Sequence, residues 1–216
     1  MTDFPNEITS LDQLREHYRH PVQPVLDKVT GVLDDGCRQF IASSTFLLVG
    51  TSDTDGNQDV SPRGGPPGFV RVLDERRLVI PDLNGNNRLD SLENIVAHPH
   101  VALLFVIPGL GETLRMNGRA SITVDDEILD EFTDQLRRPA SAIGVVVEEA
   151  YIHCAKSLRR GSLWTPEEWP PAIGRPSVGQ MLVDHSGAAG LVTAEQVETS
   201  LEDAYTEGLA ADEPLS

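Results

Sequence analysis

Cysteine and long apolar runs are scarce in this sequence. Cys37 and Cys154 are the only cysteines among 216 residues, too few for a disulfide scaffold, so we expect a reducing compartment. The longest apolar stretch, 101–107, is far too short to cross a bilayer, and the acidic N-terminus MTDFPNEITSLDQL lacks the apolar run of a signal peptide. We therefore expect a cytoplasmic protein.

Basic residues are also few: 17 Lys and Arg stand against 34 Asp and Glu, for a net charge of −17. Such a surface repels nucleic acid and anionic membranes, so neither is an expected partner. Solubility is the simplest explanation of this charge.

Several motifs of cofactor binding and catalysis are missing. The glycines do not form the dinucleotide fingerprint, and the chain has no P-loop and no hydrolase elbow. His153 and Cys154 are adjacent, but no second Cys/His pair lies at ligand spacing, so no metal site is expected. Because no convincing proton-transfer pair is present either, we expect a bound cofactor to perform the chemistry.

Short helical and strand patterns alternate along the chain. Apolar residues at helical spacing predict helices at 31–43, at about 88–97 and at 125–136. Alternating or continuously apolar segments predict strands at 45–51, 58–61, 69–73, 78–81, 101–107, 113–124 and 143–152. Strands joined by hairpins and single helices favour a mainly β fold with helices (α+β), a small antiparallel barrel with helices outside.

The segment 61–92 is the most informative part of the chain. It holds a Ser-Pro-Arg-Gly-Gly turn, a hairpin, and an Asn/Gly loop that opens onto a helix expected to begin near Arg88. Free amides at a helix start, the helix dipole and an arginine fork suit a dianion such as phosphate. Alternatively, Arg88 pairs with Asp90 or Glu93 at an ordinary Asn-capped helix, and 61–65 is a plain surface turn.

Two further groups of polar residues could complete such a site. Arg115, Asn117 and Arg119 share one face of the strand 113–124, where they could bind a polar ring edge or simply face solvent. Lys156 and Arg159 belong to the most basic cluster of the chain, which could complete an anion site or be solvated.

Four segments together resemble the pyridoxamine-phosphate-oxidase-like FMN-binding split-barrel superfamily, in its branch of probable FMN-dependent enzymes of unassigned substrate. They are DVSPRGGPPGFVRVLDERRLVIPD, NGNNRLDSLENI, PGLGETLRMNGRASI and YIHCAKSLRRGSLW, and they follow the family's order. The resemblance implies a six-stranded antiparallel split β-barrel that forms a homodimer with FMN at the subunit interface. With it we expect a helical arm over 1–30, the barrel domain over 31–169 and a helical extension over 170–216.

The resemblance also assigns residues to the cofactor. Asn87 and Arg88 match the phosphate-binding stretch, and Arg115 would place a positive charge near the flavin ring. The other matching positions are Ser61 and Arg63 on a strand-end turn, Ile80, Pro81 and Asp82 on the strand past the ring, Asn117 beside Arg115, and Lys156 and Arg159 near the phosphate from either subunit.

The chain departs from true pyridoxamine phosphate oxidases in two motifs. Asn87-Arg88-Leu89 stands in place of Ser-Arg-Lys, and the C-terminal Arg-x-His signature is missing. We therefore expect an FMN-dependent oxidoreductase that transfers hydride between flavin and a small organic substrate or NAD(P)H, without assigning the substrate. The alternatives are a flavin-binding or storage protein without turnover, and a member of the same fold that binds the deazaflavin F420 or heme.

Overall fold

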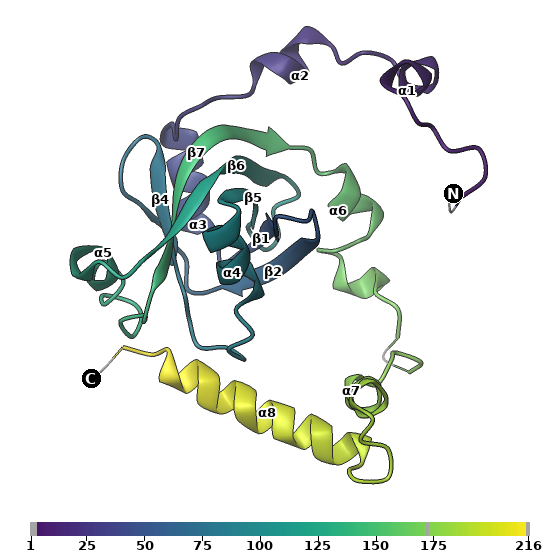
Figure 1. Cartoon of the computed structure of the whole chain (residues 1–216), viewed down its shortest axis with the longest axis vertical. Helices are drawn as coiled ribbons and strands as arrows, with labels where there is room; N and C mark the ends of the chain where they lie inside the picture. The colour runs from purple at the N-terminus through teal and green to yellow at the C-terminus, as the bar shows by residue number, and fades with distance from the viewer. Residues whose placement is uncertain (1–3, 172, 215–216) are drawn as a thin grey trace.

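A single antiparallel sheet forms the centre of the protein, as the computed structural model of residues 4–171 and 173–214 shows (Figure 1). Its order is β2-β1-β5-β6-β7-β4-β3. The strands are β1 (Phe46–Ser52), β2 (Gln58–Gly64), β3 (Arg71–Val72), β4 (Arg77–Pro81), β5 (His100–Val106), β6 (Thr113–Thr123) and β7 (Ala142–His153). The α+β class and the antiparallel pairing expected from the hairpins are confirmed.

The number of strands differs from the family expectation. The described residues form seven strands rather than six, and six of the seven agree with a predicted strand to within two residues. The exception is β2, which continues through Ser61–Gly64 and pairs there with β1, so the turn expected at 61–65 is wrong for these four residues. The additional strand, β3, has only two residues and pairs with β4 alone. Across the described residues no strand pairing joins the edges β2 and β3, so the sheet is curved but not closed.

The long pair β6–β7 shows why one face of the sheet is buried. Leu114, Met116 and Ala120 point into the core, and Arg115 and Arg119 between them face outward, as the alternation predicts. A bulge between Asn117 and Gly118 shifts the register against β7. A Cβ on Gly118 would lie 2.2 Å from the Val146 carbonyl oxygen, so the bulge requires glycine.

Two helices cover the sheet, and both begin later than predicted. Helix α3 (Asp35–Ser43) starts after Asp34, whose carboxylate accepts a hydrogen bond of 2.8 Å from the Cys37 amide. Helix α4 (Asp90–Ala97) starts two residues after Arg88, because Leu89 adopts a left-handed conformation with φ of 61°. The predicted helix start near Arg88 is therefore wrong, and Arg88 belongs to the preceding loop.

Shorter elements complete the central part. The predicted helix at 125–136 forms only over α5 (Asp126–Asp130), after which the chain continues in turns to residue 136. After β7 come α6 (Lys156–Arg160) and the 3-10 helix η1 (Pro166–Glu168). The hydrophobic core lies between the sheet, α3 and α4, with Phe69, Phe105 and Phe132 among its largest side chains.

Both ends of the chain form arms outside the sheet (Figure 1). Helices α1 (Leu11–His17) and α2 (Gln23–Asp27) bury none of their own residues. At the other end, α7 (Val178–Ser186) lies beside the beginning of the long α8 (Ala194–Ala211), which runs below the central part in this view. Residues 1–3, 172 and 215–216 of the two expected appendages lie outside the described residues.

No helix within 4–171 and 173–214 combines the length and apolar character needed to cross a bilayer.

Candidate functional site

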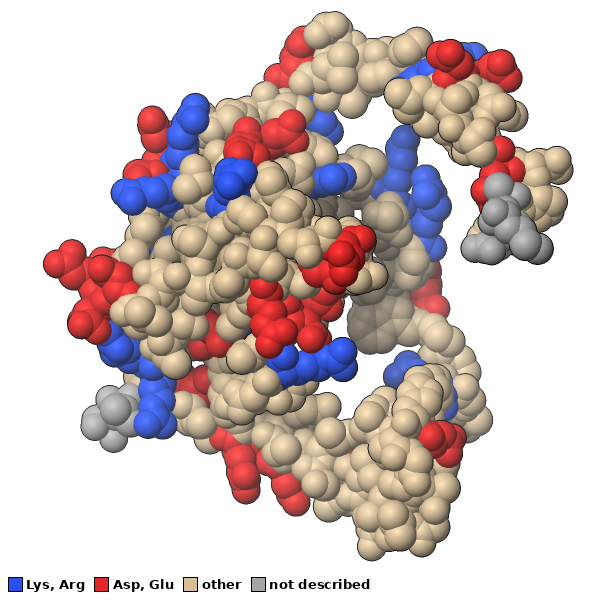
Figure 2. Space-filling view, viewed as in Figure 1, with Lys and Arg blue, Asp and Glu red and all other residues tan. Residues whose placement is uncertain are grey.

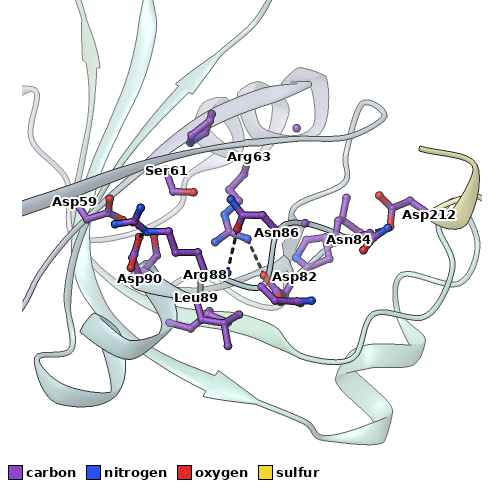
Figure 3. Close-up of a pocket in the computed structure, with 18 of the residues that line it drawn as sticks. Asp59, Ser61, Arg63, Asp82, Asn84, Asn86, Arg88, Leu89, Asp90 and Asp212 are labelled. Carbon is purple, nitrogen blue, oxygen red and sulfur yellow. Dashed lines mark hydrogen bonds and ion pairs between the residues drawn. The ribbon is translucent and has the colours of Figure 1, made fainter. Parts of the chain in front are cut away.

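A cavity of about 640 Å³ lies where β2, the segment after β4, the start of α4 and the end of α8 meet (Figure 3). Figure 2 shows the molecule hollowed between the central part and the C-terminal segment. Most of the lining belongs to the segment 61–92, which the sequence singles out; Asp59 and Val60 precede it on β2, and Leu209 and Asp212 reach the cavity from α8 and the residue after it.

Arg63 and Asp82 form an ion pair in the wall of this cavity. Nη1 of Arg63 lies 2.7 Å from Oδ1 of Asp82, and each side chain is only about one fifth exposed, at 19% and 21%. The Nε atom of Arg63 is buried and, among the described residues, has no hydrogen-bond partner. An arginine Nε–H is a strong donor, and leaving it unpaired in a buried position costs free energy, so this atom marks a place for an acceptor.

The only other buried side-chain nitrogen or oxygen without a partner in the described residues is Nε of Arg71. That arginine pairs with Asp134 and does not line the cavity. The orphaned donor at the cavity is therefore the one that bears on a ligand.

The loop before α4 shapes a second wall. The Asn86 side-chain oxygen accepts a hydrogen bond of 3.0 Å from the Arg88 amide, and Asn87 is left-handed with φ of 57°. The Arg88 side chain is 77% exposed, and its Nε lies 2.5 Å from Oδ2 of Asp90. Of the two roles considered for Arg88, the structure thus shows the pairing with Asp90.

The start of α4 opens toward the cavity. Within the part of the chain described, no side chain caps this helix, and Asp90 and Ser91 of its first turn line the cavity. The first amides of a helix have no partner inside it, so they are available to an anion. The Ser91 hydroxyl donates to the Asp59 carboxylate on β2 over 2.9 Å and fixes the helix to the sheet.

The charges around the cavity are mixed and on balance acidic. Its lining contains four carboxylates, Asp59, Asp82, Asp90 and Asp212, against the two guanidiniums of Arg63 and Arg88. A dianion bound here needs either further positive charge or the displacement of a carboxylate.

The structure brings together six of the eleven residues expected to bind the cofactor. They line the cavity and are Ser61, Arg63, Pro81, Asp82, Asn87 and Arg88. Ile80 is fully buried in the hydrophobic core instead, one residue from the cavity wall.

The remaining four expected residues lie outside the cavity of their own chain. Arg115 is exposed on the outer face of β6, its guanidinium 5.7 Å from the centre of the Tyr151 ring. Asn117 donates a hydrogen bond of 2.9 Å to Glu149 on β7. Lys156 and Arg159 lie on α6, which contributes nothing to the lining.

Four lining residues lie outside the segment 61–92 that the sequence singles out: Asp59, Val60, Leu209 and Asp212. Asp59 and Val60 directly precede that segment on β2, and the hydrogen bond between Asp59 and Ser91 depends on how α4 packs on β2. Leu209 and Asp212 are more than a hundred residues away in the chain, and no local pattern marks them.

The two cysteines differ in burial. Cys37 is buried, and burial together with the neighbouring Asp34 carboxylate raises the pKa of its thiol to about 11. Cys154 is exposed. In the described ranges no group of three or more His, Cys, Asp or Glu residues is arranged to hold a metal ion.

The fold and cavity define an antiparallel α+β protein with a polar site at one end of its sheet, and comparison with known proteins identifies the family. The profile of the family "Pyridoxamine 5'-phosphate oxidase" matches residues 33–154, more than half of the chain. The chain therefore belongs to the pyridoxamine 5'-phosphate oxidase family. A search of curated proteins gives no significant match.

Several solved structures are similar to a little more than half of this chain. HupZ of Group A Streptococcus is 17% identical with a TM-score of 0.43, covering 53% of this chain and 89% of HupZ. A putative pyridoxamine 5'-phosphate oxidase of Lactobacillus delbrueckii is 23% identical (TM-score 0.43; 56% and 95% covered). HutZ, the heme storage protein of Vibrio cholerae, is 13% identical (TM-score 0.40; 56% and 94% covered).

Proposed function

We propose that this protein is an FMN-dependent oxidoreductase and that the cavity holds the phosphate end of FMN. The observation that carries the proposal is the buried Nε atom of Arg63, a donor without a partner in the described structure, in the wall of a cavity large enough for a small ligand. Membership of the family supports the same choice of cofactor.

The residues of the cavity fit an organic phosphate in three respects. Arg63 offers a guanidinium donor, the first turn of α4 offers uncapped amides, and Ser61 offers a hydroxyl. Phe69 and Pro81 add apolar lining beside these donors. When bound, FMN supplies the ability to accept or donate a hydride, which no side chain of the chain can do alone. The protein's own part is to bind the phosphate and orient the cofactor.

The acidic lining suggests that one chain does not complete the site. We propose a homodimer in which the partner supplies positive charge to the cavity, with Lys156 and Arg159 of α6 as the candidates. Each lies outside its own cavity, and neither forms an ion pair within the described residues. Arg115 and Asn117, on the exposed face of β6, would approach the cofactor in the same way.

Titration of the purified protein with FMN, followed by quenching of flavin fluorescence, tests the cofactor assignment. We expect saturable binding that Arg63→Met weakens at least tenfold, because a charge-assisted hydrogen bond to phosphate contributes about 1.5–3 kcal/mol. Arg77→Met is the matched control, since Arg77 also forms an arginine–aspartate pair but lies outside the cavity. Absence of binding to the wild-type protein, or equal affinity of the Arg63 and Arg77 variants, would contradict the assignment.

The alternatives need separate measurements. Parallel titrations with F420 and with heme decide which ligand binds most tightly, and tighter binding of either one overturns the choice of FMN. Reduction of the bound flavin by NADH or NADPH, followed by reoxidation with a second substrate, distinguishes an enzyme from a storage protein. A protein that binds FMN but shows neither step is a storage protein.

A further inference from the structure

Helix α8 is attached to the rest of the protein at its two ends. Near its beginning, the Glu198 carboxylate accepts hydrogen bonds from the Ser177 hydroxyl (2.7 Å) and the Gly179 amide (3.2 Å) of α7. A Cβ on Gly179 would lie 2.3 Å from the carbonyl oxygen of Ala194, so the two helices meet through a glycine contact. In between, none of the residues described for α8 is buried.

The other end of α8 closes on the cavity. The Asp212 side chain accepts a hydrogen bond of 3.1 Å from the Asn84 amide, and its backbone oxygen accepts one of 2.8 Å from the Arg137 amide. Leu209, one turn earlier, and Asp212 both line the cavity. Figure 3 shows the Asp212 carboxylate directed at Asn84 from the end of the helix.

This contact places a negative group on an amide of the cavity wall. Asn84 belongs to the lining, and its N–H is a donor that an anionic ligand could use. The carboxyl end of a helix carries a partial negative charge, and the last turn of α8 has no basic residue to offset it. An anion in the cavity is therefore repelled by the end of α8 and by Asp212 together.

We propose that α8 is a lid on the cavity, that the contact between Asp212 and Asn84 holds it closed, and that an anionic ligand opens it by competing for the Asn84 amide. The identity of the anion as the phosphate of FMN rests on the proposed function, whereas the contact between Asp212 and Asn84 is independent of it. Because none of the described residues of α8 is buried, loss of the Asn84 contact leaves only the backbone hydrogen bond from Arg137 to hold Asp212, and the C-terminal half of α8 can then open without disturbing the hydrophobic core.

Hydrogen exchange of the full chain without ligand tests the closed contact. We expect Asp212→Ala to increase exchange of the amides in 205–211 about fivefold, the effect of losing one hydrogen bond with a net value near 1 kcal/mol. Glu213→Ala is the matched control, because Glu213 is the adjacent carboxylate and its side chain has no hydrogen bond or ion pair among the described residues. Equal exchange in the two variants overturns the proposal.

Inorganic phosphate then tests the competition, with sodium chloride at equal ionic strength as the reference. We expect phosphate to increase exchange of 205–211 in the wild-type protein and to have little further effect in Asp212→Ala. Slower exchange with phosphate, or no change, overturns the competition. Neither measurement uses FMN. A result that overturns the lid proposal is therefore distinct from a result that overturns the proposed binding of FMN.

Discussion

Arg63 and Asp82 neutralise each other in the cavity wall while one donor of the arginine stays free. The pair joins β2 to the residue after β4, two strands that lie near opposite ends of the strand order, over 2.7 Å. Arg63 and Asp82 are 19 residues apart in the chain, and the sequence predicts both at the site. Both the stability of the fold and the binding of a ligand therefore depend on Arg63. A substitution of its partner, Asp82, changes the two properties in opposite directions and so distinguishes them.

Asp82→Asn should lower stability and strengthen anion binding. Removal of the carboxylate leaves a mostly buried guanidinium unpaired, which we expect to cost about 1–2 kcal/mol of unfolding free energy. The same change removes a negative charge from the cavity, so the Kd for FMN should fall on the order of fivefold. Urea denaturation and fluorescence titration measure the two effects.

The control for this substitution is Asp74→Asn, which breaks the exposed pair with Arg77. It should change neither quantity appreciably. Weaker FMN binding by Asp82→Asn would mean that the aspartate, and not only Arg63, contacts the ligand.

Gly118→Ala should disrupt the pairing of β6 and β7. The added Cβ would meet the Val146 carbonyl oxygen, a backbone atom that cannot move without breaking the bulge. We expect a loss of about 3 kcal/mol in unfolding free energy, seen as a lower midpoint in thermal denaturation. Gly144→Ala, on the partner strand, meets nothing closer than 3.8 Å and should cost far less. Similar losses in both variants would argue against the bulge geometry.

Asp34→Ala should destabilise the protein at neutral pH and not at low pH. Hydrogen bonds from the Cys37 amide lower the pKa of Asp34 in the folded state. A depressed folded-state pKa gives stability that is complete above the unfolded pKa of about 3.9 and is lost as the pH falls through the folded value. We expect a difference of about 1 kcal/mol at pH 7 that vanishes in strong acid.

Denaturant unfolding at several pH values gives this profile. Asp35→Ala serves as the comparison, since Asp35 is in the first turn of the same helix but does not cap it. Its effect should be a few tenths of a kcal/mol. A pH-independent loss in Asp34→Ala would show that the carboxylate is not the cap.

The two cysteines should differ in reactivity toward a thiol reagent at pH 8. Cys154 is exposed, whereas Cys37 is buried and has a pKa raised to about 11, so almost none of it is thiolate at this pH. We expect one thiol per chain to react in the folded protein and two after unfolding. Cys154→Ser should abolish the fast reaction, and a remaining fast thiol would contradict the burial of Cys37.

Local patterns predicted most of the strands because these strands alternate or are continuously apolar over their own length; β2 was predicted too short because Ser-Pro-Arg-Gly is typical of a turn. Leu114, Met116 and Ala120 could be assigned to the core in this way. The start of α4 was predicted too early because a left-handed Leu89 is unusual for a branched side chain and has no signature in the sequence.

Only part of the candidate site could be predicted for a similar reason. Residues of the compact segment 59–92 come together through hairpins, so their proximity follows from short-range pairing. The pairing of Arg88 with Asp90 depends on a side-chain rotamer, and the contact of Asp212 with Asn84 joins residues that are 128 positions apart in the chain. Neither is encoded in a local pattern.

Strand β2 ends the sheet on one side, and Pro62 stands in its middle, paired with Leu48. Proline has no amide hydrogen, so the row of donors along this strand is interrupted. A continuous further strand from another molecule cannot add here, which protects the protein from aggregation through its sheet. A single substitution, Pro62→Val, would restore the missing donor and open this edge of the sheet to pairing with a second molecule.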